Sequence, residues 1–334
     1  MHRTIITVCF AILALFQSTV APVRAEVAEI TLAQQNGLAY LPMMVMESQG
    51  LIEAEVAARN LPAVKTNWIR LSGPSALVDA MLSGSLHFAA NGAPSLALLW
   101  DRTKGGVKAL GGMTIDNLFL NTRNPAINSI KDFTEKDRIA VPSIKISNQA
   151  LYLQMAAEKA FGVGEQFRLD AFTIGLGHPD AMAAMLNPNS EITAHFTSSP
   201  FHEAELKAGA RTILTSNEVL GGRATQLVFT TTEKFRAENP KLTEATVAAL
   251  GKAMAWINAD KPRAAKFFLD ITKDKKTAEA DILATLNSPD HDYDLTPART
   301  GNTVAFMHRL GLIKTKPDSW KDLFFPEVHG LPGS

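Results

Sequence analysis

The chain is nearly free of cysteine. Its only cysteine, Cys9, lies in an apolar N-terminal segment that we expect to be removed. The remaining chain then has no thiol, which excludes disulfide bonds, a thiolate nucleophile and cysteine metal ligands. Aromatic residues are also few, at 7% of the sequence, and the four tryptophans are too widely spread to predict an aromatic cage.

The chain has no excess of charge of either sign. Its 33 lysines and arginines equal its 33 aspartates and glutamates. Nucleic acids and anionic membranes are bound by basic surfaces, so the composition argues against both as partners. The 334 residues, 46% of them hydrophobic, are enough for about two globular domains.

The only long apolar run lies at the N-terminus. A basic start, Met1-His2-Arg3, precedes apolar residues 4–16, and Val23-Arg24-Ala25 resembles a cleavage site. The apolar run is shorter than the roughly 20 residues of a membrane-spanning helix. We therefore expect residues 1–25 to be a signal peptide, and the mature protein to begin at Glu26 and to be periplasmic.

One pattern occurs twice in the sequence. The first copy runs from Gly73 to Pro94 and the second from Gly177 to Pro200. In each copy a Gly/Pro turn opens an apolar-periodic helix, a short strand follows, and small polar residues open another helix. The repeat predicts two α/β lobes that face each other and hold a small ligand between their helix N-termini.

Strands and helices alternate along most of the chain, which predicts a mostly parallel sheet flanked by helices in each lobe. Predicted strands lie at 29–33, 64–71, 86–90, 107–113, 138–141, 212–214 and 226–232. Predicted helices lie at 40–49, 148–161, 245–258, 262–271, 278–286 and 297–310. We expect residues 26–116 to form the first part of lobe 1, residues 117–232 to form lobe 2, and residues 233–334 to return to lobe 1 with C-terminal helices. The chain would then pass between the lobes twice, and these two connecting segments would make a two-strand hinge. Residues 320–325 should pack on lobe 1.

Polar turns follow the predicted strands where ligands of parallel sheets bind. They lie at 34–37, 72–75, 91–95, 147–149, 177–180 and 195–199. Unpaired amides at a helix start carry partial positive charge and bind small anions without arginine. The same turns also suit a neutral heterocycle held by Asn and Gln, and each by itself is an ordinary helix cap.

The second copy adds three candidate ligand contacts. His178 follows the turn that opens its helix, and His195 and Thr197 end its strand, so all three are expected near the cleft. Glu203 and Glu205 follow on a helix, two residues apart. Because that spacing turns them to different sides, we expect them on a solvated surface.

No catalytic motif is complete. The Gly175-Leu176-Gly177 string continues to Asp180 where a dinucleotide motif needs glycine. There is no P-loop and no G-x-S-x-G elbow, and His202-Glu203 lacks the second histidine of a zinc motif. The sequence thus predicts a protein without catalytic residues, cofactor or metal.

Several runs resemble the solute-binding proteins of ABC importers, specifically the nitrate/sulfonate/taurine (NMT1/THI5-like) group. The matching runs are residues 30–34, 37–42, 50–53, 72–80 and 86–95. The resemblance covers nearly the whole mature chain. The family often has an acidic residue where this chain has His87.

The resemblance implies a two-lobed type II periplasmic receptor, monomeric, that closes on a small-molecule ligand. It would deliver a sulfonate- or nitrate-like anion to an inner-membrane permease driven by an ATPase. By position in the motifs, the family's cleft residues fall on Gln34, Tyr40, Ser72, Gly73, Asn91, Gly92, Ser147 and Asn148.

Two alternatives use the same scaffold. Thiamine-pyrimidine synthases resemble this family but use a cysteine-rich segment with iron, and the mature chain has no cysteine, which argues against them. A periplasmic sensor module, which presents its ligand to a signalling partner, is not distinguished from a transport receptor by the sequence.

Overall fold

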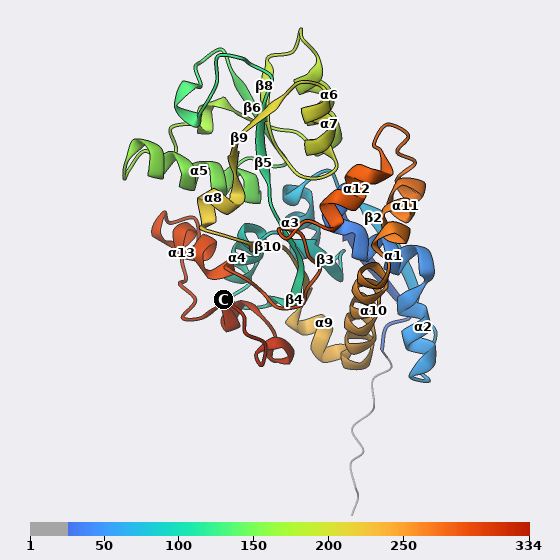
Figure 1. Ribbon diagram of the computed structural model, residues 1–334. Coiled ribbons are helices and arrows are strands. Elements are labelled where there is room, and N and C mark those ends of the chain that lie inside the picture. Colours follow the sequence, from blue (N-terminus) through green and yellow to red (C-terminus); the bar gives the residue numbers. More distant parts are fainter. Residues whose placement is uncertain (1–25) are drawn as a thin grey trace, which may run out of the picture.

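The computed structural model describes residues 26–334. The predicted signal peptide, residues 1–25, lies outside the described residues. Two lobes, each built on a five-stranded sheet, lie one above the other in Figure 1. None of the helices within residues 26–334 combines the length and apolar character that crossing a bilayer requires.

The two sheets have the same pattern of strand directions. The first has the order β2 (Lys65–Arg70), β1 (Glu29–Gln34), β3 (Phe88–Asn91), β10 (Ala224–Thr232), β4 (Val107–Asp116). The second has the order β7 (Thr173–Gly175), β6 (Arg138–Val141), β8 (Ile192–Thr197), β5 (Phe119–Thr122), β9 (Arg211–Thr215). In each sheet only the fourth strand, β10 or β5, runs antiparallel to its neighbours. The two predicted α/β lobes are therefore confirmed, and each has a mixed sheet in which four of the five strands run in the same direction.

The internal repeat has a direct structural counterpart. The first copy forms α3 (Pro74–Ser83), β3 and α4 (Ala93–Arg102), and the second forms α6 (His178–Leu186), β8 and α7 (Phe201–Lys207). Strands β3 and β8 each hold the third place in their sheet. Gly73 and Gly177 are the N-caps of α3 and α6, and each is followed by proline in the first turn, where a missing N–H leaves no hydrogen bond unmade.

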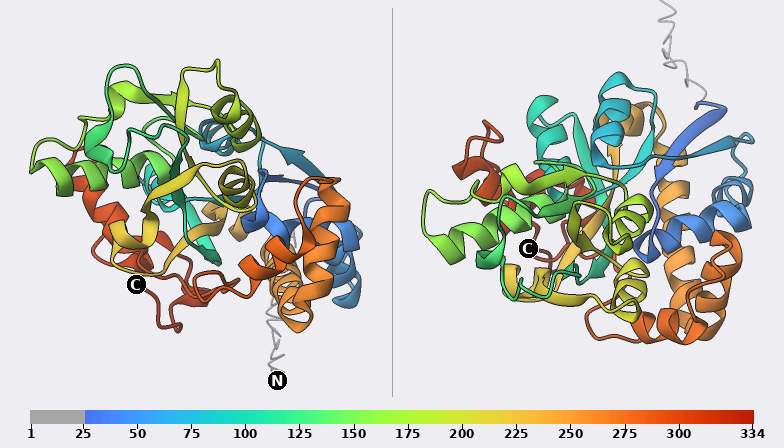
Figure 2. Two further views of the ribbon diagram at one scale, coloured as in Figure 1. Left: turned by 45° about the horizontal axis from the view of Figure 1, so that its top comes forward. Right: turned by 90° about the horizontal axis from the view of Figure 1, so that it is seen from above.

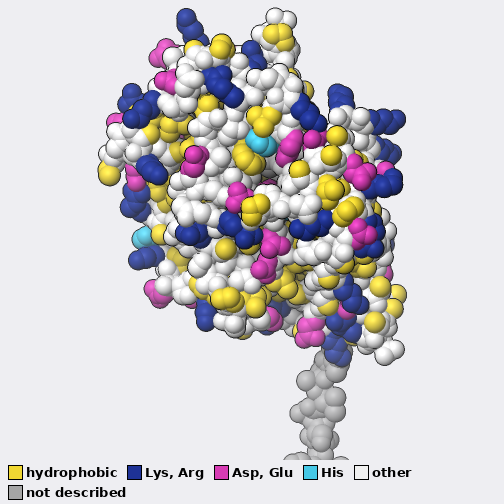
Figure 3. Space-filling model, viewed as in Figure 1, with side chains coloured by type: hydrophobic (Ala, Val, Ile, Leu, Met, Phe, Trp, Pro, Cys, Tyr) yellow, Lys and Arg dark blue, Asp and Glu magenta, His cyan; other side chains and the backbone are white. Residues whose placement is uncertain are grey.

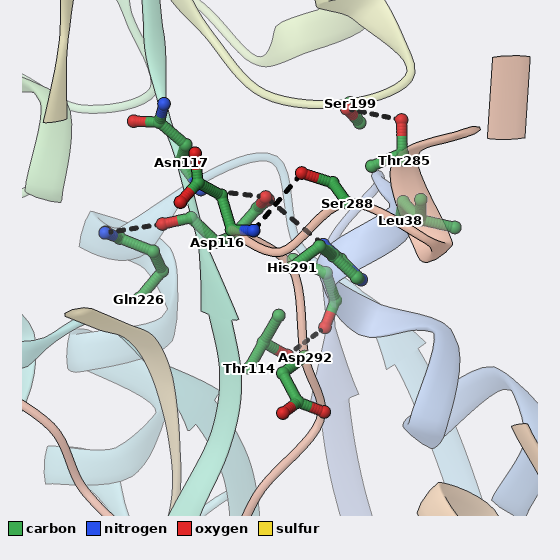
Figure 4. A network of polar contacts seen from close by, with 12 residues as sticks. Leu38, Thr114, Asp116, Asn117, Ser199, Gln226, Thr285, Ser288, His291 and Asp292 are labelled. Carbon is green, nitrogen blue, oxygen red and sulfur yellow. Dashed lines mark hydrogen bonds and ion pairs between the residues drawn. The ribbon is translucent and has the colours of Figure 1, made fainter. Parts of the chain in front are cut away.

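The lobes are joined by two crossings that run side by side. The chain passes from β4 into β5 and returns through β10, and Ala224 pairs with Asp116 where the two crossings meet. Figure 4 shows polar contacts at this point: Gln226 Nε2 donates to the Asp116 carbonyl oxygen at 3.2 Å, and His291 Nδ1 lies 3.2 Å from Asp116 Oδ1. This is the two-strand hinge that the sequence predicted.

Helices cover both sheets. The second sheet has α5 (Asn148–Phe161) between its strands besides α6 and α7, together with the short turns η2 (Ile130–Asp132) and η3 (Asp170–Phe172). Helix α8 (Ser216–Leu220) follows its last strand, β9, and precedes β10. The helices that follow β1 are η1 (Leu38–Tyr40), α1 (Leu41–Gln49) and α2 (Leu51–Ala58). Those that follow β10 are α9 (Glu233–Glu238), α10 (Pro240–Ala259), α11 (Lys261–Thr272), α12 (Glu279–Leu286), α13 (Thr300–Arg309), η4 (Trp320–Leu323) and η5 (Pro326–Val328). Figure 2 shows α10, α11 and α12 beside α1 and α2 from two further directions.

Helix α2 was not predicted from the sequence. Gly50, in the left-handed conformation with φ 58°, ends α1, and α2 begins at the next residue. A glycine of this kind marks the end of a helix, but it gives no sign that a second helix starts at once. The largest core cluster gathers side chains of α1, α2 and α10, including Met43, Ile52 and Leu250.

The C-terminal segment packs on the first lobe, as expected for residues 320–325. Phe324 forms a parallel bridge with Ala109 of β4, and the Phe325 amide donates to the Ala109 carbonyl oxygen at 2.8 Å. Both phenylalanine side chains are fully buried. Lys/Arg and Asp/Glu side chains are intermixed on the face seen in Figure 3, in keeping with the balanced charge.

We predict that Phe325→Ala lowers the free energy of unfolding by about 3–5 kcal/mol, because it leaves a cavity in the core of the first lobe. Urea unfolding measures the effect. The matched control is Phe167→Ala, whose side chain is 44% exposed, and it should cost less than about 1 kcal/mol. Equal losses in both variants would contradict this account of the C-terminal segment.

Candidate functional site

A cavity of about 60 Å³ lies between the lobes. A larger cavity, of about 270 Å³, adjoins it and shares Gln35, Asn36, Pro142 and His178 with it. We call the first one the central cavity. None of the residues that line it is Asp, Glu, Lys or Arg. Six of them carry carboxamide side chains: Gln35, Asn36, Asn91, Asn148, Gln149 and Gln226.

Four helices begin at the wall of the central cavity. Pro74 begins α3 and Gly92 caps α4 in the first lobe, while Asn148 begins α5 and His178 begins α6 in the second. Each helix is at least nine residues long. The partial positive charges of four helix N-termini therefore meet around a site that holds no full charge.

The lobes approach each other at backbone distance around the cavity. A Cβ added at Gly92 would overlap Asn148 Oδ1, and one added at Gly73 would lie 2.6 Å from the Pro142 carbonyl oxygen. The Leu38 amide donates to the Ser199 carbonyl oxygen across the gap at 3.0 Å. The two lobes are thus in direct contact around the cavity. A Cβ at position 73 would meet backbone, and one at position 92 would meet the Asn148 side chain.

Three carboxamides of the cavity wall have fixed orientations. Asn148 Nδ2 donates to the backbone oxygen of Gln226 at 2.7 Å, and Asn91 Nδ2 donates to Thr230 Oγ1. Gln226 Oε1 accepts from Asn148 Nδ2 at 3.0 Å and from the Tyr152 hydroxyl at 3.1 Å. Asn91 Oδ1 and Asn148 Oδ1 are left buried without a donor among the described residues. A buried acceptor without a partner costs about 1–3 kcal/mol, so a ligand with N–H or O–H groups would relieve this cost.

His178 is half-buried and is the cavity end of a chain of hydrogen bonds that leads into the second lobe. Its Nδ1 lies 2.9 Å from His195 Nε2, and His195 Nδ1 lies 2.6 Å from Glu205 Oε1. On the cavity side, His178 Nε2 lies 3.4 Å from Gln149 Nε2. At the far end, Asn121 Nδ2 donates to Glu205 Oε2 at 2.8 Å. We call His178, His195 and Glu205 the histidine relay.

Burial shifts the pKa values along the relay. It lowers the pKa of His195 to about 3, and burial together with the adjacent His195 holds the pKa of His178 well below its usual value. Burial also raises the pKa of Glu205 to about 8. The expectation that Glu205 lies on a solvated surface was wrong, since the residue is fully buried. Its helix, α7, packs against β5 and β9, and Glu205 lies on the covered side of the helix.

The structure brings five of the predicted site residues to the central cavity: Tyr40, Asn91, Gly92, Asn148 and His178. Ser72 lines the adjoining cavity, and Gly73 lies at the contact between the lobes. Ser147 caps α5, accepting from the Ala150 amide and donating to the Ser143 carbonyl oxygen. Gln34 donates to Glu47 Oε2, and His195 and Thr197 are fully buried. Gln34, Ser147, His195 and Thr197 are not among the described residues that line either cavity.

Sequence reasoning missed other residues of the wall. Gln35, Asn36, Gln149 and Ser198 belong to turns that were recognised as polar, but they were not chosen. Gln226 was missed because it lies in a β-rich run, and only the crossing between the lobes brings it to the cavity. Within residues 26–334, no group of three or more His, Cys, Asp and Glu side chains is arranged to hold a metal ion.

Several solved structures match the chain over most of its length. The alkanesulfonate-binding protein SsuA from Xanthomonas axonopodis pv. citri, bound to MOPS, matches with a TM-score of 0.69 at 17% identity, over 87% of this chain and 96% of that one. The periplasmic nitrate-binding protein NrtA from Synechocystis PCC 6803 matches with a TM-score of 0.67 at 13% identity, over 89% of this chain and 85% of that one. A Candida albicans gene product with the generic periplasmic binding protein fold matches with a TM-score of 0.68 at 10% identity, over 90% and 96%.

The chain therefore has the periplasmic binding protein fold, as the resemblance implied. Its structural neighbours include sulfonate- and nitrate-binding proteins, the groups named from the sequence motifs. At these identities the likeness shows the fold alone. No protein-family model and no curated protein matches the sequence.

We predict that Gly92→Ala holds the lobes apart, because the added methyl group overlaps Asn148 Oδ1. Small-angle scattering should give a larger radius of gyration than for the wild type. The control is Gly251→Ala in α10, where no atom lies within 4 Å of the added Cβ. It should leave the scattering unchanged. Scattering curves for Gly92→Ala that match the wild type would contradict the close approach.

We predict that wild-type stability falls, relative to Glu205→Gln, as pH rises from about 5 to above 8. The pKa of Glu205 is about 8 in the folded state against 4.5 for an ordinary Glu. Between these values the folded state keeps a proton that the unfolded state has lost, so unfolding becomes easier by up to about 1.4 kcal/mol per pH unit. Gln does not titrate, so the variant lacks this slope.

Urea unfolding at several pH values measures the difference. The matched control is Glu165→Gln, an exposed glutamate paired with Arg168, which should keep the wild-type slope. A Glu205→Gln protein with the same pH dependence as the wild type would show that Glu205 is ionised in the folded state near neutral pH.

Proposed function

We propose that this protein is an exported, periplasmic solute receptor. It captures a small organic or inorganic anion between its lobes by hinge closure and delivers it, as a monomer, to an ABC permease with its ATPase. The observation that carries the proposal is the meeting of four helix N-termini and six carboxamides around an uncharged cavity between two lobes.

The predicted bounds of the lobes change at one place, because β10, residues 224–232, belongs to the sheet of the first lobe. The lobes of the proposed receptor are therefore residues 26–116 with 224–334, and residues 117–223. Rotation about the paired crossings at Asp116 and Ala224 would open the cavity. The closed arrangement would be favoured by a ligand that contacts both walls, since only contacts made in the closed state shift the equilibrium. Tyr40, Asn91 and Gly92 would contribute from one side, and Asn148 and His178 from the other.

Helix N-termini explain how such a cavity holds an anion without arginine or lysine. Amides of the first helical turn have no partner within the helix and point along its axis. Gln35, Asn36 and Gln149 can turn their N–H groups to the ligand at no cost in buried charge. The N–H groups of Asn91, Asn148 and Gln226 already donate to oxygens of the protein. The structural neighbours described as alkanesulfonate-binding and nitrate-binding support this ligand class.

The site supports binding and not catalysis. The histidine relay orients an imidazole much as a catalytic triad does, but a triad also needs a nucleophile beside that imidazole. The hydrogen-bond partners of His178 among the described residues are Gln149 and His195, neither of which is a nucleophile. This favours a receptor over an enzyme on the same scaffold.

A neutral heterocycle with ring N–H groups is the second candidate ligand. It is favoured by Asn91 Oδ1 and Asn148 Oδ1, two buried oxygens of described residues that line the central cavity and have no donor. An oxyanion would leave both oxygens without donors, whereas a pyrimidine-like ring would donate to them. The two ligand classes are separated by the following experiment.

We predict that at least one small oxyanion or sulfonate, tested as nitrate, methanesulfonate and the zwitterion taurine, raises the melting temperature. A ligand at about 100 times its dissociation constant stabilises the folded state by roughly 2.7 kcal/mol. Gln149→Ala should reduce this ligand-induced shift, because the Gln149 side chain lines the cavity.

The control is Gln154→Ala on the same helix, where the glutamine binds Asp170 and is not among the residues that line the cavity. Its own melting temperature falls, but the ligand-induced shift should stay. Stabilisation by pyrimidines and not by anions would select the second candidate. A protein that responds to neither class would contradict the receptor proposal.

A further inference from the structure

We propose that Glu205, buried behind two histidines, sets the hydrogen-bonding character of His178 toward the ligand. In one protonation state of the relay His178 presents an N–H donor to the cavity, and in the other it presents a lone pair. Glu205 is then a specificity-determining residue that the ligand never touches, and anion capture is coupled to the uptake of one proton. The coupling to an anion rests on the proposed function, whereas the relay itself does not.

The geometry leaves each member of the relay one partner on each side. His195 is fully buried and lies between His178 Nδ1, at 2.9 Å, and Glu205 Oε1, at 2.6 Å. A neutral imidazole has one donor nitrogen and one acceptor nitrogen. Each neutral ring must donate on one side and accept on the other. The protonation state of Glu205 therefore fixes the tautomer of His195, and the tautomer of His195 fixes that of His178.

With Glu205 ionised, all donors point away from the cavity. His195 Nδ1–H donates to the carboxylate, so His195 Nε2 is an acceptor and takes a hydrogen bond from His178 Nδ1–H. His178 Nε2 then carries a lone pair on the cavity side. Gln149 Nε2, 3.4 Å away, can donate to it. A lone pair backed by a buried carboxylate repels an anion.

With Glu205 protonated, all donors point toward the cavity. One proton enters at His178 Nε2, the Nδ1 proton of His178 passes to His195 Nε2, and the Nδ1 proton of His195 passes to Glu205 Oε1. Both rings remain neutral, and the net change is one proton gained by the relay. His178 Nε2–H is then a donor toward the ligand, which suits an anionic acceptor. The Gln149 carboxamide must turn over in this state, because its Nε2 is a donor and cannot accept from His178 Nε2–H.

The surroundings of Glu205 favour the proton on the carboxyl group and not on the rings. The titratable groups that act on Glu205 besides the relay are His202 and Glu203 of its own helix. Strands β5 and β9 contribute the neutral side chains of Asn121, which donates to Glu205, and Thr212, which donates to Asn121 Oδ1. Burial raises the pKa of Glu205 to about 8 and lowers the pKa of both relay histidines.

The relay is tested without any ligand by nitrogen NMR of the histidine rings from pH 6 to 10. We expect His178 to change from the Nε2–H to the Nδ1–H tautomer as pH rises through the titration of Glu205. In Glu205→Gln the tautomer should stay Nε2–H at every pH. The side-chain oxygen of the new glutamine is needed as the acceptor for Asn121 Nδ2. Its NH₂ group then faces His195 and donates to it, as the protonated carboxyl group of Glu205 would.

Calorimetry with methanesulfonate and nitrate, in buffers of different ionisation enthalpy, tests the coupling. Wild-type affinity should fall about tenfold for each pH unit above the pKa of Glu205, with uptake of close to one proton per anion. Glu205→Gln should bind the same anions with a flat pH profile and no proton uptake. The control is Asp170→Asn, a carboxyl of the same lobe held by Gln154, which should keep the wild-type profile.

A His178 tautomer that does not change with pH in the wild type would overturn the inference, and so would a Glu205→Gln protein whose anion binding keeps the wild-type pH dependence. If Glu205→Gln does not fold, the wild-type tautomer and proton uptake decide the matter. If neither anion binds at any pH while the tautomer changes as expected, the relay stands and the proposed anion receptor fails.

Discussion

The close backbone approach of the two lobes is the constraint on which the rest of the site depends. Gly92 at the start of α4 lies directly against the Asn148 side chain at the start of α5, and Gly73 lies against the Pro142 carbonyl oxygen. Because no Cβ stands between them, helix N-termini from both lobes reach the same small cavity. Their partial charges then act on one ligand, where a wider gap would leave each helix end to water.

The central cavity is lined by polar groups, and none of its lining residues is Asp, Glu, Lys or Arg. A lysine or arginine at its centre would have to be desolvated each time the lobes closed, and desolvation of an ion is costly. Carboxamides and helix amides avoid this cost and hold their orientations through neighbours such as Gln226, which is tied to Asn148 and Tyr152. His178 is the member of the histidine relay that lines the wall, and Glu205 lies fully buried behind it, away from solvent.

The two halves of the repeat share a topology but differ in chemistry. In the first copy Ala89 stands at the position of His195, and Pro74 at the position of His178, so the first lobe has no counterpart of the relay. The first lobe contributes glycine, proline and asparagine to the wall, which shape it and bring its backbone close. The second lobe contributes the imidazole that responds to protonation. A symmetric scaffold thus carries an asymmetric site.

The sequence by itself determined the two α/β lobes, the repeat and most of the polar turns, because helix starts after Gly73 and Gly177 and the strands beside them follow from local patterns of turn residues and apolar spacing. It also placed Tyr40, Asn91, Asn148 and His178 near the cleft, since these follow strand ends in the repeat and the motif. Only the tertiary structure decided that Gln226 reaches the cavity, that His195 stands behind His178, and that Glu205 faces inward. Those three facts depend on how strands from distant parts of the chain lie side by side. The local sequence of a short helix such as α7 does not indicate which of its faces will pack against a sheet.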